Sequence, residues 1–280
     1  MPTAPSAADD KFERDYFLGG RVYGDDFSPA QIKEWYAQEE SGYYDLTQTH
    51  GGGYTYGYHA LNRLHGFGCL QGRLFDCCLA LGCARGDDVS PLAPQVRKFV
   101  AVEPAEQWWS DNIGGTPASF IKPAISGDIA LPDGAVDLAT CLGVLHHIPN
   151  AGHVLGEIAR VMKPGGIFVL REPIATMGDW RQPRRGLTRN ERGFPLAWLD
   201  EKVAEAGFYI MRRRLCMFPA TKRLGGILRL LRLGPVYNNR LLTVADWLVS
   251  GLFAWNLHYH RDTLLKKVAP VSVFYVLEKQ

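Results

Sequence analysis

Short apolar runs alternate with amphipathic stretches through the middle of the chain, and this pattern predicts a parallel sheet. Four runs are short, mostly apolar and bounded by glycine, proline or charged residues, which is typical of buried strands. They cover residues 75–81, 99–102, 136–141 and 167–170. Between the last two, residues 151–162 carry apolar side chains at helical spacing on one face. Strands that alternate with helices predict an α/β fold with helices on both faces of the sheet.

The N-terminal part of the chain is predicted to be helical. Ser28, Pro29 and Gln31 supply an N-cap, a proline at the first helical position and a capping-box partner. We therefore expect a helix that runs through about Glu39, within a helical cap or lid formed by residues 1–70.

The C-terminal part predicts two more strands, at residues 208–218 and 271–277. They are widely separated in sequence. We therefore expect one main domain over residues 71–280, with an insert at about residues 220–263 between the last two strands.

Composition narrows the class of protein. The chain has 280 residues, of which 46% are hydrophobic and 21% charged, and this balance excludes a disordered or collagen-like chain. The six cysteines form no C-x-x-C pair, so we expect buried thiols and no metal site. No signal-peptide pattern begins the sequence, and the apolar stretch at 241–257 is short for a membrane span. These features predict a soluble, cytoplasmic protein.

Charge is spread unevenly along the chain. The formal net charge is only +2, yet residues 181–240 carry fourteen basic and four acidic side chains, a local net charge of +10. A block of one sign attracts partners of the other sign. We expect Arg184, Arg185 and Arg192 to face an acceptor that bears phosphate or carboxylate, and we expect no nucleic acid partner.

The first predicted strand runs into a glycine-containing turn, and the second ends in an acid. Gly82 and Gly86 follow the first strand, where glycine lets the backbone approach a ligand closely. Glu103 stands at the end of the second strand, where a carboxylate can accept hydrogen bonds from both ribose hydroxyls of a nucleoside cofactor. This arrangement indicates a nucleoside cofactor, and a dinucleotide-dependent oxidoreductase is one alternative.

Five motifs in order make the indication more specific. LALGCARG, VAVEP, GDIALPDGAVDLATC, GVLHHIP and LGEIARVMKPGGIFVLREP together resemble the class I S-adenosylmethionine-dependent methyltransferases of the small-molecule type. The resemblance covers roughly residues 75–175. It implies a Rossmann-like, doubly wound, mostly parallel seven-stranded sheet whose last strand is antiparallel. It also implies S-adenosylmethionine as cofactor.

The resemblance also assigns cofactor-binding positions. Four positions stand where the family's glycine loop wraps the methionine part of the cofactor: Gly82, Cys83, Ala84 and Gly86. Six more stand where the family contacts the ribose, the adenine and the end of the next strand: Glu103, Pro104, Asp128, Ile129, Leu142 and Gly143. The chain departs from the family at Ala80, where an acid is common, and at Ala84, which replaces a glycine. Pro91 and Pro94 fall where the first crossover helix usually runs, and proline breaks a helix.

Histidines are the candidate bases for an acceptor hydroxyl, because the imidazole pKa suits proton transfer near neutral pH. We rank His147 first and His146 second, both after the third of the four central strands, followed by His258 and His260 from the insert. The His-His-Ile-Pro stretch is also a common helix entrance.

Two further groups could contact the acceptor. Tyr54 and Tyr56 follow a run of three glycines, and aromatic faces attract a sulfonium cation. An apolar helix face is the alternative for these tyrosines. Residues 221–234 combine basic and apolar side chains at helical spacing, which fits a helix at a membrane surface, a lid over the acceptor or a solvated face.

The sequence therefore predicts methyl transfer from S-adenosylmethionine to an oxygen atom of a small-molecule acceptor, with nitrogen and carbon as the alternative atoms. The expected acceptor is anionic or linked to a lipid or sugar. An NAD(P)-dependent oxidoreductase and a non-catalytic cofactor-binding protein of the same fold are the alternatives.

Overall fold

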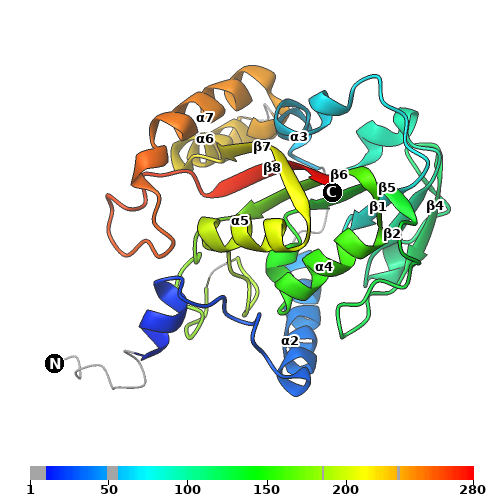
Figure 1. Ribbon diagram of the computed structural model, residues 1–280. Coiled ribbons are helices and arrows are strands. Elements are labelled where there is room, and N and C mark those ends of the chain that lie inside the picture. Colours follow the sequence, from blue (N-terminus) through cyan, green and yellow to red (C-terminus); the bar gives the residue numbers. More distant parts are fainter. Residues whose placement is uncertain (1–10, 49–55, 185, 232–233) are drawn as a thin grey trace.

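An eight-stranded sheet forms the centre of the molecule (Figure 1). The computed structural model describes residues 11–48, 56–184, 186–231 and 234–280. The strand order is β3-β4-β2-β1-β5-β6-β8-β7. The strands are β1 (Cys78–Leu81), β2 (Phe99–Val102), β3 (Asn112–Ile113), β4 (Thr116–Ile121), β5 (Val136–Leu142), β6 (Met162–Pro173), β7 (Phe208–Cys216) and β8 (Ser272–Lys279).

The strand directions confirm the predicted sheet. Strands β4, β2, β1, β5 and β6 pair in parallel, and the last strand, β8, is antiparallel to both β6 and β7. The sequence pattern did not locate β4, because it is only partly buried and contains Pro117. The two-residue β3 adds an eighth, antiparallel strand at the edge.

Helices cover both faces of the sheet, as the alternating pattern predicted. The α-helices are α2 (Pro29–Gln48), α3 (His59–His65), α4 (Ala151–Val161), α5 (Leu196–Glu205), α6 (Pro219–Leu230) and α7 (Arg240–Leu252). Short helices are η1 (Glu13–Phe17), η2 (Phe67–Leu70), η3 (Ser90–Gln95), η4 (Glu106–Trp108), η5 (Leu145–His147), η6 (Val236–Asn238) and η7 (Ala254–Asn256). Among the described residues, no helix is long and apolar enough to cross a membrane.

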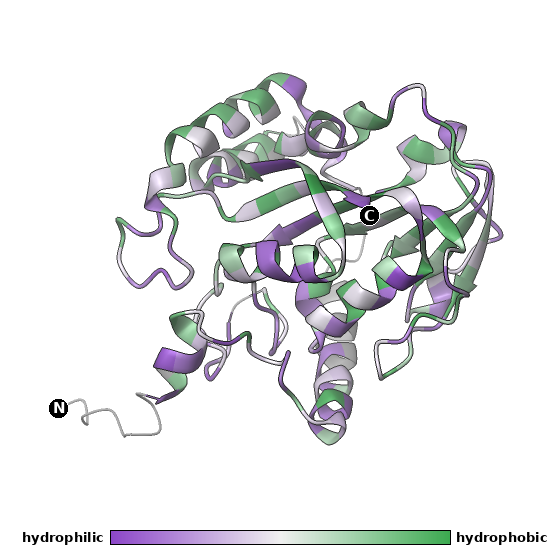
Figure 2. Cartoon of the chain, viewed as in Figure 1, coloured by the Kyte–Doolittle hydropathy of each residue, from purple (hydrophilic) through white to green (hydrophobic). Residues whose placement is uncertain are grey.

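Burial on both faces explains why the central strands are continuously apolar. Leu79 and Leu81 of β1 pack with α4 and α5, which lie in front of the sheet in Figure 1. Cys78 and Ala80 point to the other face and pack with α3, η2 and η3. Side chains alternate along a strand, so each β1 residue needs an apolar side chain. Figure 2 shows the same pattern as hydrophobic strands at the centre.

The connections beside the glycine loop are unusually short. Pro91 and Pro94 lie in η3, so the crossover from β1 to β2 contains a 3-10 helix where an α-helix is usual. The connection from β2 to β4 contains only η4 and β3. As a result the edge strand reaches the glycine loop, and a Cβ atom on Gly86 would lie 2.7 Å from the side chain of Ile113.

The N-terminal helix begins where predicted and is longer than predicted. Gln31 Oε1 accepts hydrogen bonds from the Ser28 backbone N–H (2.9 Å) and hydroxyl (2.8 Å) at the start of α2, which runs on to Gln48. Trp35 is buried and donates through Nε1 to the His147 carbonyl (2.8 Å). These contacts fasten α2 to the turn that follows β5 (Figure 1).

The C-terminal insert is held to the sheet by one buried acid. Asp246 of α7 is 1% exposed, and its carboxylate accepts hydrogen bonds from the backbone N–H groups of Met217 (2.7 Å) and Phe218 (2.8 Å). Tyr237 donates a longer hydrogen bond to the same carboxylate (3.4 Å). Asp246 therefore joins α7 to the segment between β7 and α6.

Replacing Asp246 should destabilise the fold. We expect Asp246→Ala to lower the free energy of unfolding by about 2–4 kcal/mol, because two buried N–H groups lose their acceptor. Urea denaturation measures this loss, with Asp262→Ala at an exposed position as the control. An unchanged midpoint for Asp246→Ala would contradict the role assigned to this residue.

Candidate cofactor and acceptor site

The glycine loop has the backbone conformation that close approach to a ligand requires. Gly82, Ala84 and Gly86 have φ angles of +64°, +50° and +83°. This left-handed region favours glycine, so Ala84 adopts a strained conformation there. A Cβ atom on Gly82 would lie 2.3 Å from the side chain of Val144, because the loop runs against the turn after β5. Side chains at Gly82 and Gly86 would therefore clash with Val144 and Ile113 and displace the loop.

Glu103 ties the glycine loop to the end of β2. It is 4% exposed, and its carboxylate accepts hydrogen bonds from the backbone N–H groups of Ala84 (2.9 Å) and Ala105 (3.0 Å). Burial raises the pKa of Glu103, and the two N–H groups oppose that rise. The carboxylate thus lies at the strand end and against the loop, where a ribose-binding acid is expected. The neighbouring Pro104 is exposed.

A second buried acid lies just after the loop, and the sequence analysis did not single it out. Asp88 is buried, its Oδ1 atom has no hydrogen-bond partner, and burial raises its pKa to about 7. Ala80, where the family often has an acid, is fully buried in β1. A buried carboxyl oxygen without a hydrogen-bond partner is costly unless something compensates it. An acid two residues after the last loop glycine was the available signal in the sequence.

The end of β5 is supported from behind by a buried arginine. Arg171 donates to the Leu142 carbonyl (2.9 Å) and to Asn62 (3.3 Å) and stacks 4.5 Å from the centre of the Tyr58 ring. Gly143 follows with φ +82°. Arg171 therefore holds the backbone at two predicted cofactor positions.

Of the two tyrosines predicted to contact the acceptor, only Tyr56 lies among the described residues. Tyr56 is buried, and its hydroxyl accepts a hydrogen bond from Asn62 Nδ2 (2.8 Å). It therefore lies behind Arg171 in the packed interior. Tyr54 lies outside the described residues.

The predicted adenine positions occupy different surroundings. Asp128 is exposed and contacts His153 Nε2 (2.8 Å) and the Ser126 hydroxyl (2.8 Å). Ile129 is buried, and its backbone N–H donates to Glu157 (2.9 Å). No direct contact links these two residues to Glu103 or to the glycine loop, so their role toward adenine remains a prediction.

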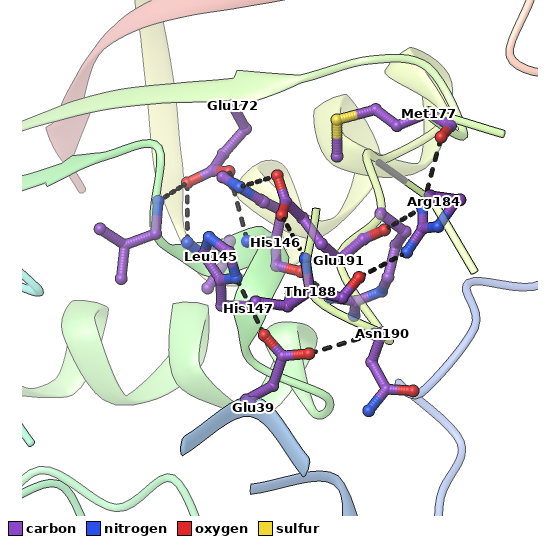
Figure 3. Close-up of polar contacts among 12 residues, drawn as sticks. Glu39, Leu145, His146, His147, Glu172, Met177, Arg184, Thr188, Asn190 and Glu191 are labelled. Atoms are coloured by element: carbon purple, nitrogen blue, oxygen red, sulfur yellow. Dashed lines mark hydrogen bonds and ion pairs between the residues drawn. The ribbon is translucent and has the colours of Figure 1, made fainter. Parts of the chain in front are cut away.

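The two histidines after β5 lie in a cluster of carboxylates (Figure 3). His146 Nδ1 contacts Glu172 (2.7 Å), and Nε2 faces Glu191 (3.7 Å). Burial alone would lower the pKa of His146, but the two carboxylates outweigh burial and raise it to about 9. Glu191 is correspondingly held near a pKa of about 2 by His146 and His147, despite burial. The neighbouring carboxylates therefore favour the protonated form of His146 over the neutral form.

His147 is placed by the N-terminal helix. Its Nδ1 atom contacts Glu39 (3.1 Å), whose other oxygen accepts a hydrogen bond from the Asn190 backbone N–H (3.1 Å). The ring centres of His146 and His147 are 4.2 Å apart. Figure 3 shows both rings between the Glu172 and Glu39 carboxylates. Three separate segments thus meet at this pair.

The arginines of the basic block differ from the expectation that they face an acceptor. Arg192 is fully buried and donates to the carbonyls of His146 (2.8 Å) and Pro149 (3.0 Å). Arg184 donates to the carbonyls of Glu191 (2.6 Å) and of residues 177, 188 and 189, so it holds its own loop together. Arg185 lies outside the described residues. Burying a guanidinium requires acceptors, and backbone carbonyls supply them here.

The two insert histidines lie away from the His146–His147 pair. His258 Nδ1 contacts the Asn256 carbonyl (3.0 Å). His260 Nδ1 contacts the Thr176 hydroxyl (3.0 Å), and its ring stacks 4.4 Å from the ring of Phe17. Both imidazoles take part in packing between loops, and neither contacts the histidines after β5.

Comparison with known proteins agrees with this geometry. Residues 79–170 match the family model described as a methyltransferase domain. The chain is 30% identical over 143 residues to a 2-methyl-6-phytyl-1,4-hydroquinone methyltransferase of Synechocystis, covering 50% of this chain and 38% of that protein. It is 31% identical over 105 residues to a sterol 4-C-methyltransferase of Caenorhabditis elegans, covering 35% of this chain and 31% of that protein. The chain thus spans about a third of the length of the curated relatives that it matches.

A solved structure shares the fold. A candidate methyltransferase from Bacillus halodurans superposes with a TM-score of 0.51 at 15% identity and covers 79% of this chain and 98% of its own. The fold, the glycine loop and the strand-end acid are typical of an α/β domain that binds a nucleoside cofactor. The chain contains a class I S-adenosylmethionine-dependent methyltransferase domain, as the five motifs predicted.

Loss of the Glu103 carboxylate should weaken cofactor binding. We expect Glu103→Gln to bind S-adenosylhomocysteine about 10- to 100-fold more weakly, since hydrogen bonds to a charged group contribute about 1.5–3 kcal/mol. Isothermal titration calorimetry measures the affinity, with Glu106→Gln on the exposed η4 as the control. Equal affinity in wild type and Glu103→Gln would rule out a ribose role.

Asp88 should make stability depend on pH. The folded state retains a proton that the unfolded chain loses above its ordinary pKa, so Asp88 destabilises the wild type increasingly as pH rises toward about 7. We expect the free energy of unfolding of Asp88→Asn to rise by about 1–3 kcal/mol relative to that of the wild type between pH 5 and pH 8. Denaturation at several pH values measures this gain, with the exposed Asp87→Asn as the control. A pH-independent difference would show that Asp88 is not buried as a neutral acid.

Proposed function

We propose that this chain transfers the methyl group of S-adenosylmethionine to the oxygen of a lipid-like small molecule that it takes from a membrane surface. The observation that carries the proposal is an apolar, basic surface on the C-terminal insert. We call this surface the apolar flank. Its members are each 56–83% exposed: Ile227, Leu230, Leu231, Leu241, Leu248, Leu252, Trp255, Leu264 and Leu265.

The apolar flank is larger than scattered surface residues would suggest. Leu241, Leu248 and Leu252 recur at helical spacing and lie on one stripe of α7. Figure 2 shows hydrophobic residues along both α6 and α7. Contiguous exposed apolar surface marks interaction sites in proteins. An amphipathic helix with such a stripe lies in the membrane interface.

Charge favours a lipid surface as the partner of the apolar flank. Residues 219–268 carry eight basic and two acidic side chains. One of the two acids, Asp246, is buried beneath α7 and does not offset the positive charge at the surface. Basic side chains beside an apolar face are attracted to anionic headgroups. The predicted contact through 221–234 therefore extends to α7 and residues 254–265 in this proposal.

The apolar flank is continuous with the loops beside the carboxyl edge of the sheet. Tyr259 donates to the Gly193 carbonyl (3.0 Å), and His260 contacts Thr176 just after β6. In Figure 1 the orange segment that follows α7 lies near the carboxyl end of β6, beside the N-terminal helical turn. Ligands of α/β sheets bind at this edge. An acceptor drawn from a membrane at the apolar flank would thus have a short route to the site.

The two named relatives support the choice of acceptor class. One acts, by its name, on a phytylated hydroquinone and the other on a sterol. Both acceptors are largely apolar, which supports a lipid-like acceptor. The second name places the methyl group on a carbon atom, so the names do not bear on the choice of oxygen. The matched parts are the cofactor-binding regions, so the acceptor class rests on the apolar flank first.

The chain's own residues supply alignment and proton transfer. S-adenosylmethionine, when bound, supplies a methyl group on a positively charged sulfur. Gly82, Glu103 and Gly143 would position that cofactor, and alignment of the reactants contributes about 7–11 kcal/mol in such reactions. His147 is the imidazole placed to accept the hydroxyl proton, because His146 is enclosed between the Glu172 and Glu191 carboxylates. His147 is also the more exposed of the pair, with 31% of its side chain accessible.

The test is methyl transfer from labelled S-adenosylmethionine to a prenylated hydroquinone and to a sterol, each in anionic vesicles. We expect transfer to at least one acceptor, and about tenfold less vesicle binding for Leu248→Asp with Leu252→Asp, because apolar burial is lost. Leu74→Asp, exposed elsewhere, is the matched control.

Three outcomes would contradict parts of the proposal. If the double variant bound vesicles as well as the wild type, the apolar flank would not be the membrane-binding surface. Methyl transfer only to water-soluble acceptors would contradict a lipid-like acceptor. Binding of S-adenosylhomocysteine without turnover on any acceptor would favour the non-catalytic alternative.

A further inference from the structure

Two imidazoles and a carboxylate converge at the acceptor side of the site, although they come from two separate segments. His146 and His147 lie in η5, and Glu191 lies in the loop before α5. One ligand atom from each lies within 4.8 Å of the others. We propose that His146, His147 and Glu191 bind a divalent transition-metal cation. Two imidazoles and one carboxylate are ligands that zinc, iron and manganese take in proteins.

The distances are close to those of a bound state. Nε2 of His146 and Oε1 of Glu191 are 3.7 Å apart. Two ligands at about 2.0–2.1 Å from a tetrahedral metal are separated by about 3.4 Å. A small rotation of the Glu191 side chain would therefore bring both atoms to ligand distance. His147 would complete three protein ligands and leave a fourth position open, as in catalytic metal sites.

Each histidine also has the supporting carboxylate that metal ligands usually have. Glu172 contacts His146 at Nδ1 (2.7 Å), which turns the other ring nitrogen toward Glu191. Glu39 contacts His147 (3.1 Å) and orients its ring. Carboxylates that hold the second imidazole nitrogen fix the ring and make it a stronger ligand. Figure 3 shows this arrangement of inner and outer groups.

The loop that carries Glu191 is also held in place before any cation binds. Arg184 donates to the carbonyls of Glu191 and Thr188 (3.0 Å), and the Thr188 backbone N–H donates to the Glu191 carboxylate (3.2 Å). Rigid support of this kind is what a binding site requires. The ligand set is therefore preorganised from both segments.

The cluster is enclosed but not sealed, and it lies beside the cofactor loop. The side chains of His146, Glu191 and His147 are 9%, 14% and 31% exposed, so access is through His147. A Cβ atom on Gly143 would lie 3.8 Å from the His146 ring. A cation here would stand next to a predicted cofactor position.

This location deepens the proposed function and rests on it in one respect. A cation with an open position can bind an acceptor hydroxyl and lower its pKa. With a cation bound, the hydroxyl would lose its proton without an imidazole base. The binding site itself stands on the geometry alone.

The experiment is titration of the full-length chain, freed of metal by chelation, with Zn²⁺, Mn²⁺ and Co²⁺ in the absence of cofactor. We expect one cation per chain for at least one metal. We expect Glu191→Gln and His147→Gln each to weaken binding at least tenfold. Ligand-field absorption of bound Co²⁺ should change in both variants. Circular dichroism checks that each variant is folded.

Matched controls separate the site from other histidines and acids. His153→Gln and Glu205→Gln lie outside the cluster and should leave the affinity for the cation unchanged. No stoichiometric binding of any of the three metals, or equal binding in the two cluster variants, would overturn the proposal. S-adenosylhomocysteine affinity, measured on the same samples, reports on the proposed function separately, because cation binding requires no cofactor.

Discussion

The carboxylate of Glu172 makes the interactions on which the turn after β5 depends. It lies at the end of β6 and is completely buried, where a lone charge is very costly. It accepts hydrogen bonds from the backbone N–H groups of Val144 (3.0 Å), Leu145 (2.8 Å) and His146 (3.3 Å) and contacts the His146 ring. Burial would raise the pKa of Glu172, but these partners lower it. The turn after β5 is therefore folded around one charge from the neighbouring strand.

Other parts of the chain then attach to that turn. Trp35 binds the carbonyl of His147 from the N-terminal helix, and Arg192 binds the carbonyl of His146 from the loop before α5. Glu39 and Glu191 reach the two imidazoles from the same two elements. Because Glu172 holds the backbone of the turn, these distant segments find one common set of partners there. The segments around the turn are thus held together by buried polar contacts, whereas the sheet is held by apolar packing.

The sequence showed the excess of basic residues at 181–240 correctly, but the prediction that its arginines face an acceptor was wrong for Arg184 and Arg192. Arg192 is buried against carbonyls, and Arg184 braces its own loop. Arg213 pairs with Asp200, and Arg214 stacks 4.4 Å from the ring of Trp247. Lys222, Arg223 and Arg240 of the insert do stay exposed, beside exposed leucines. Net charge along a sequence says nothing of which side chains find internal partners.

The sequence by itself determined the sheet, the cofactor class and the glycine loop. Buried strands leave continuous apolar runs, a tight loop needs glycine, and the acid directly follows a strand. All three signals can be recognised in the sequence because each lies within a few neighbouring residues. The sequence could not locate β4, which is half exposed, or single out Asp88, whose burial depends on what packs over it. The contacts of Glu39 with His147 and of Glu191 with His146 could not be predicted for the same reason. Only the tertiary structure decided those contacts, because it alone brings together residues that the chain holds far apart.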